Sequence, residues 1–225
     1  MVDEARIAGV LDHTLLRAGA GEVEVRRLCG EAREFGFAAV CVQGAFVELC
    51  AGLLGGCGVE VACVVGFPLG APGKGVKAFE ARVAVEAGAG ELDVVARVDA
   101  LLAGKDGLFV DDLAVVVEAG GGARVKAILE TGLLGEEEMR RGVRLARRAG
   151  CAFVKTSSGF GVGGASVEAV RVLREEAGKG MGVKASGGIR TAAQVRDFLE
   201  AGADRIGSSS CVAIMRELAG ESPRA

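Results

Sequence analysis

Two lysines have the residue type and the setting of amine catalysts. Lys155 ends the apolar run 151–155 and precedes the small residues 156–159, and Lys184 lies in GVKASGGIR, residues 182–190. A lysine is a nucleophile only when its amine is uncharged, and the ordinary pKa of that amine is about 10.4. A second cation nearby disfavours the charged form. The pair therefore predicts covalent chemistry in which one lysine attacks a carbonyl group, although the residues alone do not say which one.

A carboxylate on another apolar run could complete a proton-transfer set. Asp93 lies in GELDVV, residues 90–95, and could move a proton through a water molecule. The alternative is structural: each lysine forms an ion pair with Asp12, Asp93 or Glu130 and neutralises the core. For Asp93, this alternative is a salt bridge with Lys184.

Three small-residue turns predict a phosphate site. Residues 158–161, 186–189 and 207–210 are rich in glycine and serine, and each follows an apolar run. Turns that lead into helices present backbone N–H groups to an anion, and glycine lets the backbone approach its oxygens closely. We therefore expect amine chemistry beside a bound phosphate group.

The elements that must position these residues alternate along the whole chain. Short apolar runs separated by segments of helical periodicity predict a parallel sheet covered by helices. The predicted strands are residues 10–13, 38–42, 60–66, 91–95, 124–129, 152–156, 182–185 and 205–207. The clearest predicted helices are residues 22–35, 74–87, 111–118, 136–149 and 191–201, the last with Thr191 as N-cap.

Eight strand–helix units favour a closed barrel over an open sheet. The chain has 225 residues, and no G-x-G-x-x-G follows its first strand. We expect an α/β fold, a (β/α)8 TIM barrel, as a single domain over residues 1–225 with a short tail at the end. The strands' carboxyl ends then converge on one mouth, at or near which we place Asp12, Cys41, Phe67, Asp93, Lys126, Glu130, Lys155, Lys184 and Ser209. Asp12, Cys41, Lys126 and Thr156 are candidate supporting residues.

Composition excludes several classes of function. The net charge is −3 and tryptophan and tyrosine are absent, so we expect no nucleic-acid partner. No uninterrupted apolar segment is long enough to cross a membrane, and the first residues lack a signal peptide's apolar core. The seven cysteines include no C-x-x-C pair, which is typical of reduced thiols in a cytoplasmic protein.

Metal-assisted and hydrolase chemistry are disfavoured as well. His13 is the only histidine, and no H-E-x-x-H or G-x-S-x-G is present. We expect no metal and no cofactor, and we expect His13 to be a structural residue at the barrel mouth.

The chain resembles deoxyribose-phosphate aldolase nearly end to end. The resemblance is carried by LDHTLL (11–16), VVGFPLGA (64–71), KAFEA (77–81), GAGELDVV (88–95), VKAILE (125–130), FVKTSSGF (153–160), VKASGGIR (183–190) and GADRIGSSS (202–210). It implies a class I aldolase that reversibly cleaves 2-deoxy-D-ribose 5-phosphate to D-glyceraldehyde 3-phosphate and acetaldehyde without a metal. Such barrels are usually dimers or tetramers.

The resemblance also implies roles for individual residues. Lys155 matches the family's Schiff-base lysine. Lys184 matches its second lysine, which lowers the pKa of the Schiff-base amine and takes part in proton transfer. Asp93 matches the aspartate that donates and accepts protons. The residues that match the family's phosphate cradle are Gly159, Gly187, Gly188, Gly207, Ser209 and Ser210.

The chain departs from the family's usual pattern at several places. It has Gln43-Gly44 instead of Asn-Pro, Arg97 instead of Asn, and the loop 72–75 instead of a threonine-rich stretch; its last residues, 221–225, include no tyrosine. Two alternatives stay open: a Schiff-base aldolase for another phosphorylated sugar, and a non-catalytic barrel that binds phosphosugars.

Overall fold

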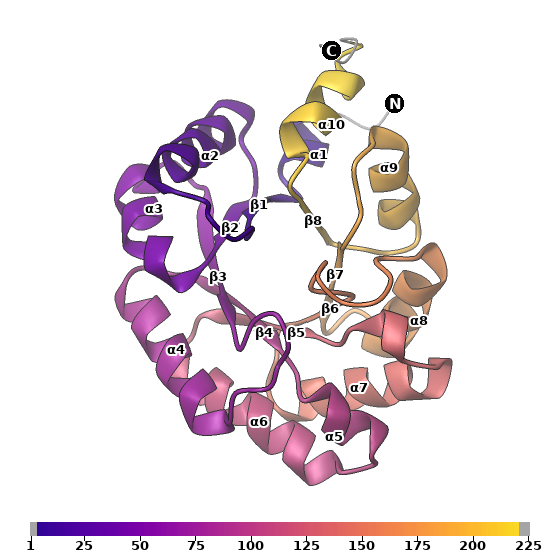
Figure 1. Cartoon of the computed structure of the whole chain (residues 1–225). Helices are drawn as coiled ribbons and strands as arrows, with labels where there is room; N and C mark the ends of the chain where they lie inside the picture. The colour runs from indigo at the N-terminus through magenta and orange to yellow at the C-terminus, as the bar shows by residue number, and fades with distance from the viewer. Residues whose placement is uncertain (1–3, 221–225) are drawn as a thin grey trace.

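The structure, a computed structural model, describes residues 4–220 and contains one closed parallel barrel. Each strand pairs with the next along the chain, and β8 pairs with β1 (Figure 1). The strands are β1 (Leu11–Leu15), β2 (Ala39–Val42), β3 (Glu60–Val65), β4 (Glu91–Val95), β5 (Arg124–Ile128), β6 (Phe153–Lys155), β7 (Gly182–Ser186) and β8 (Arg205–Ser208). The predicted (β/α)8 fold is confirmed. The predicted tail, residues 221–225, lies outside the described residues.

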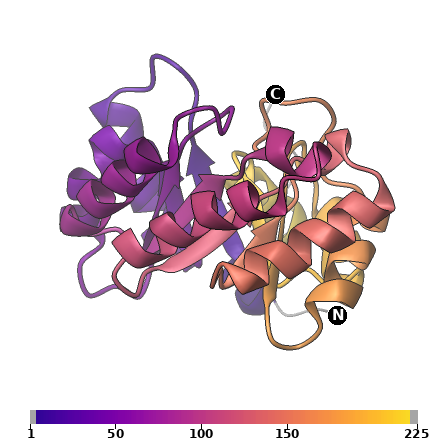
Figure 2. The same cartoon turned by 90° about the horizontal axis from the view of Figure 1, so that it is seen from below.

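Helices surround the strands on the outside of the barrel, as the turned view also shows (Figure 2). They are α1 (Glu4–Ala8), α2 (Glu22–Phe35), α3 (Val47–Leu54), α4 (Lys74–Glu86), α5 (Val98–Leu102), α6 (Asp106–Ala119), α7 (Glu136–Arg148), α8 (Val167–Ala177), α9 (Ala192–Glu200) and α10 (Cys211–Leu218). Two 3₁₀ turns, η1 (Gly44–Phe46) and η2 (Thr131–Leu133), follow β2 and β5. No helix within residues 4–220 is long and apolar enough to cross a membrane.

Local sequence explains where the helices begin and end. Helix α7 opens with three glutamates and closes with two arginines, which complements the helix dipole at both ends. Thr191 caps α9 by accepting the Gln194 N–H at 3.2 Å, as predicted. Helix α6 begins at Asp106, five residues before the predicted start, because Gly107 in its first turn hides the helical pattern.

The strands have an apolar outer face and a polar inner face. On β4, Leu92 and Val94 belong to the hydrophobic core between strands and helices, whereas Glu91 and Asp93 join an ion network inside the barrel. Side chains alternate along a strand, so one strand serves both sides. A separate small apolar cluster, Leu16, Cys41, Ala62 and Val64 with Phe67 packed against it, lies apart from the main core. The barrel interior therefore contains a buried cluster of charged side chains and, beside it, a small apolar cluster.

Candidate active site

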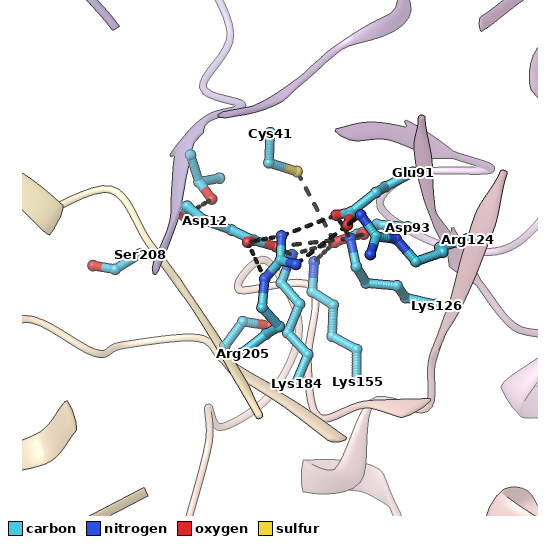
Figure 3. A network of polar contacts seen from close by, with 12 residues as sticks. Asp12, Cys41, Glu91, Asp93, Arg124, Lys126, Lys155, Lys184, Arg205 and Ser208 are labelled. Atoms are coloured by element: carbon cyan, nitrogen blue, oxygen red, sulfur yellow. Dashed lines mark hydrogen bonds and ion pairs between the residues drawn. The ribbon is translucent and has the colours of Figure 1, made fainter. Parts of the chain in front are cut away.

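Lys155 and Lys184 lie side by side on neighbouring strands. Lys155 ends β6, and its register partner on β7 is Lys184. The ammonium nitrogens (Nζ) of both donate to the same carboxylate oxygen, Oδ2 of Asp93, at 2.7 Å each (Figure 3). The three residues that the sequence singled out for chemistry are therefore in direct contact.

Further charged side chains extend this contact into a buried network. Lys126 Nζ donates to Asp93 Oδ1 at 2.9 Å and also hydrogen-bonds Glu91. Lys184 Nζ lies 2.5 Å from Asp12 Oδ2, and Arg205 contacts Asp12 at 2.6 Å and Glu91 at 3.1 Å. Figure 3 shows these side chains pointing toward one another and toward Lys155, from strands β1, β4, β5, β6, β7 and β8. Every carboxylate of the network has at least two cationic partners.

Counting charges identifies what the network favours. It holds four cationic side chains, Lys126, Lys155, Lys184 and Arg205, against the three carboxylates Asp12, Glu91 and Asp93. At the edge of the network, the half-exposed Arg124 contacts both Glu91 and the half-exposed Glu60. The charges of Arg124 and Glu60 cancel, so this pair does not change the count. An uncompensated buried charge is unfavourable. The release of one proton therefore balances the cluster and favours one uncharged amine.

The surrounding carboxylates determine the direction of the Lys184 pKa. Burial disfavours the charged form of Lys184, but the carboxylates of Asp12 and Asp93 together outweigh it and raise the pKa of Lys184 above its ordinary value of 10.5. Burial opposes the ionised form of Asp93, yet the three lysines hold its pKa well below 3.8. Repulsion between the lysines predicted a lowered pKa for one of them. That one is not Lys184, because the carboxylates of Asp12 and Asp93 both contact its amine.

Access also distinguishes the lysines. A cavity of about 300 Å³ is lined by Lys155 and by residues that follow β1, β6, β7 and β8, whereas Lys184 and Asp93 are absent from its lining. The Lys184 side chain is fully buried, and that of Lys155 is 4% exposed. Of these three residues only Lys155 borders the cavity, and Lys184 and Asp93 lie behind it.

The predicted phosphate cradle surrounds the same cavity with one exception. Gly159, Gly187, Gly188, Gly207 and Ser209 line it. Ser210 instead lines an adjacent hollow of about 710 Å³, and its N–H donates to Ser208 Oγ at 2.9 Å. Ser208 Oγ in turn donates to Ile189 O at 2.6 Å, which joins the loops after β7 and β8. Gly187 has φ 101°, and a Cβ there would lie 3.1 Å from Gly164 Cα, so glycine is required.

Two arginines in the cavity lining were missed by sequence reasoning. Arg17 follows β1 and contacts Glu24, and Arg190 ends the GVKASGGIR motif. No sequence signal marked Arg17. Arg190 could have been found, because the motif places it directly after the glycine turn, where a cation would face an anion.

The supporting candidates take different places. Cys41 Sγ lies 4.0 Å from Asp93 Oδ2, and burial together with Asp93 raises the pKa of its thiol. Thr156 Oγ1 donates to Ser186 O at 2.8 Å and accepts from Ser186 N at 3.0 Å, which ties β6 to β7. Asp12 and Lys126 belong to the network but are not at the mouth: they are the second and third residues of their strands. Asp12 and Lys126 were therefore placed too near the strand ends, as were Asp93 and Lys184, the third residues of β4 and β7.

Three other predicted positions stand outside the lysine network. His13 lies on β1, and its side chain contacts α2, where its Nε2 is 2.8 Å from Glu31 Oε2, so it faces outward and not into the barrel interior. Glu130 hydrogen-bonds the Ser158 N–H and makes no ion pair with either lysine. Arg97, a departure from the family pattern, pairs with Asp99 at 2.6 Å on the surface. Within residues 4–220, no group of three or more His, Cys, Asp or Glu side chains is arranged to hold a metal ion.

Comparisons with known proteins point to one family. The family model described as DeoC/LacD family aldolase matches residues 7–217. Deoxyribose-phosphate aldolase of Carboxydothermus hydrogenoformans is 47% identical over 222 residues, which cover 97% of each chain. The enzyme of that name from a Geobacillus species is 48% identical over 213 residues, covering 94% of this chain and 96% of the relative. The tetrameric deoxyribose phosphate aldolase structure from Aeropyrum pernix superposes with a TM-score of 0.91 at 36% identity, over 97% and 93% of the two chains.

Proposed function

The chain belongs to the DeoC/LacD family of aldolases, and from this premise we propose that it is a class I deoxyribose-phosphate aldolase. The proposed reaction is the reversible cleavage of 2-deoxy-D-ribose 5-phosphate to D-glyceraldehyde 3-phosphate and acetaldehyde. The observation that carries the proposal is the placement of Lys155. Its amine borders a cavity surrounded by phosphate-type turns, with a buried cation and a carboxylate directly behind it.

Binding sets the geometry of the proposed reaction. The phosphate group lies against the turns at Gly187, Gly188 and Gly207, with Ser209 beside them, and the aldehyde carbon reaches Lys155. Holding both ends of the sugar converts the attack into an effectively unimolecular step. Arg190 adds a cation to the same lining.

Lys155 then acts as the covalent catalyst. Its uncharged amine adds to the aldehyde carbon C1, and loss of water gives an iminium. The C3 hydroxyl loses its proton as the C2–C3 bond breaks, and the bonding electrons move into the iminium to form an enamine. D-Glyceraldehyde 3-phosphate leaves, the enamine is protonated at C2, and water releases acetaldehyde and regenerates the amine.

Asp93 and Lys184 serve the proton transfers in this proposal. Asp93 is held ionised by the lysines around it, so it can accept a proton through a water molecule and return it. Lys184 stays cationic because of Asp12 and Asp93, and its charge opposes a second positive charge on its neighbour Lys155. The buried charge count supports the same division of roles.

We infer two further properties that lie beyond the active site. Seven cysteines without disulfide partners fit a reducing compartment, so we place the protein in the cytoplasm. The tetrameric relative from Aeropyrum pernix supports assembly into a homo-oligomer, a dimer or tetramer. We expect no metal or cofactor to be required, and a chelator should leave the rate unchanged.

A direct cleavage assay tests this function. The purified protein should release D-glyceraldehyde 3-phosphate from 2-deoxy-D-ribose 5-phosphate far faster than from ribose 5-phosphate or fructose phosphates. Preference for another phosphorylated sugar would favour the alternative aldolase. Thermal stabilisation by phosphosugars without any cleavage would identify a binding protein. Lys155→Arg is the matched inactive control, because arginine cannot be deprotonated.

A further inference from the structure

Glu130 adopts a backbone conformation that only glycine normally accepts. Its φ is 54° and its ψ is 60°, and no other non-glycine residue within residues 4–220 has a positive φ. This left-handed conformation is unfavourable for an L-residue, because Cβ crowds the following carbonyl oxygen. It persists only where surrounding contacts impose it. Contacts of Glu130 must therefore hold it in this conformation, and these contacts lie outside the lysine network.

The Glu130 carboxylate binds the loop between β6 and α8. The residue is 6% exposed, and its Oε1 accepts a hydrogen bond from the backbone N–H of Ser158. A Cβ on Gly161 would meet the other carboxylate oxygen, so the loop passes directly over the Glu130 carboxylate. The neighbouring Thr131 N–H donates to Thr156 O at 3.0 Å. Residues 156–161 are thus attached to the end of β5 at two points.

That loop contributes one side of the cavity. Ser158, Gly159 and Phe160 all line it, and Ser158 Oγ accepts the Phe160 N–H at 3.1 Å. Ser158 follows Lys155 by only three residues. A bond to the Ser158 N–H therefore fixes the loop relative to the reactive amine. The Phe160 ring extends from the loop to an edge-to-face contact with Phe67, centroid to centroid 5.2 Å, on the loop after β3.

We propose that Glu130 is a positioning residue for the phosphate end of the substrate, acting through the Ser158 loop. The inference rests on the proposed function for the identity of that substrate. Glu130 is not part of the cavity lining, and one of its oxygens is bound to Ser158, so it does not itself meet the ligand. Through the Ser158 N–H it holds Gly159 and Phe160 in the wall of the cavity that Lys155 also lines. An unphosphorylated sugar has no phosphate group to place against this loop.

Three variants separate positioning from general stability. Glu130→Gly removes the carboxylate and also relieves the backbone, so loss of function in it does not come from strain. Glu130→Asn tolerates the left-handed conformation with a side chain one carbon shorter, and replaces the glycine variant if that one fails to fold. Glu130→Gln retains an oxygen acceptor for the Ser158 N–H. Glu137→Gln, on the exposed first turn of α7, is the matched control for the loss of one negative charge.

The measurement compares the effect of each variant on phosphorylated ligands with its effect on unphosphorylated deoxyribose. Glu130→Gly should raise the KM for deoxyribose 5-phosphate and the calorimetric Kd for inorganic phosphate by about tenfold, the size of a lost charge-assisted hydrogen bond. Its kcat/KM for unphosphorylated deoxyribose should stay within about twofold, and Glu137→Gln should resemble the wild type. Glu130→Gln, which keeps a neutral acceptor, should fall between the wild type and Glu130→Gly.

Two results would overturn the inference. One is an unchanged phosphate Kd and KM in Glu130→Gly. The other is an equal loss of activity on both sugars, which would indicate a general disturbance of the site. The phosphate titration also separates this inference from the proposed function. A wild type that binds phosphate but cleaves neither sugar would refute the aldolase, while weaker phosphate binding by Glu130→Gly would still support the positioning role.

Discussion

Lys155 and Lys184 are register partners on β6 and β7, and their ammonium nitrogens contact the same oxygen of Asp93 at 2.7 Å. One carboxylate oxygen thus lies between the amine that borders the cavity and a cation that burial keeps from solvent. A proton can pass between these groups with little movement. The arrangement explains how a barrel interior can hold one lysine charged and leave its neighbour available for covalent chemistry.

Replacing Lys184 should remove activity but keep the fold. In Lys184→Met the fixed cation is lost, while Lys126 and Arg205 still pair with the carboxylates that remain. We expect kcat to fall by about 10²- to 10⁴-fold, the range for a lost proton-transfer or electrostatic group. Steady-state kinetics and circular dichroism measure the two effects. Activity within a few fold of the wild type would rule out the role proposed for Lys184.

Asp93→Asn should damage both catalysis and stability. The amide keeps the volume but removes the charge that Lys126, Lys155 and Lys184 share. We expect the free energy of unfolding to fall by about 3–5 kcal/mol, as for other broken buried ion pairs, and kcat to fall by at least about 100-fold. Urea unfolding gives the first quantity.

The exposed pair near the end of the same strand provides the control for Asp93→Asn. Asp99→Asn breaks the contact with Arg97 and should change the free energy of unfolding by no more than about 1 kcal/mol. An equal loss of unfolding free energy in Asp93→Asn and Asp99→Asn would mean that the buried network stabilises the fold no more than an exposed ion pair does.

The pKa shifts predict a broad stability plateau against pH. Asp12 and Asp93 have folded pKa values below 3.8, so their contribution is complete above 3.8 and is lost as the pH falls toward the folded values. Lys184 has a folded pKa above 10.5, so its contribution is complete below 10.5 and is lost as the pH rises through the folded value. Urea unfolding at a series of pH values should therefore show no slope from these groups near neutrality. Asp12→Asn should flatten the acid limb; an unaltered acid limb would contradict the assignment.

A second buried ion pair, outside the cavity, should matter for stability alone. Lys77 on α4 donates to Asp112 on α6 at 2.6 Å and to Val95 O at 2.8 Å, and both charged side chains are buried. Lys77→Met leaves the Asp112 carboxylate uncompensated and should lower the free energy of unfolding by about 3–5 kcal/mol. The double variant Lys77→Met/Asp112→Leu should recover most of that loss. Equal stabilities of the single and double variants would contradict an uncompensated Asp112 carboxylate as the cause of the loss.

The sequence predicted most of the framework and the central residues, for local reasons. Strand β4 was predicted to the residue, because its apolar run is bounded by Gly90 and by the polar residues that follow it. The lysine pair and Asp93 were found because charges inside apolar strands need partners or a function.

The rest depends on barrel closure, which local pattern does not encode. Glu91 and Arg205 complete the network across 114 residues of sequence, and Arg205 meets Asp12 across 193. Without those distances, Asp12 and Asp93 could be named as possible partners of the lysines, but the sequence could not show that both contact Lys184 and raise its pKa. Glu130 followed a strand end as expected, but its bond to the Ser158 loop could not be read from spacing.

The most direct test of the account is reductive trapping. Treating the protein with deoxyribose 5-phosphate or acetaldehyde and borohydride should reduce the iminium and leave an ethyl group on the Nζ of one lysine, which peptide mass spectrometry can locate. We expect the adduct on Lys155 and none in Lys155→Arg. An adduct on Lys184 or Lys126, or cleavage of the sugar phosphate with no trapped lysine at all, would contradict it.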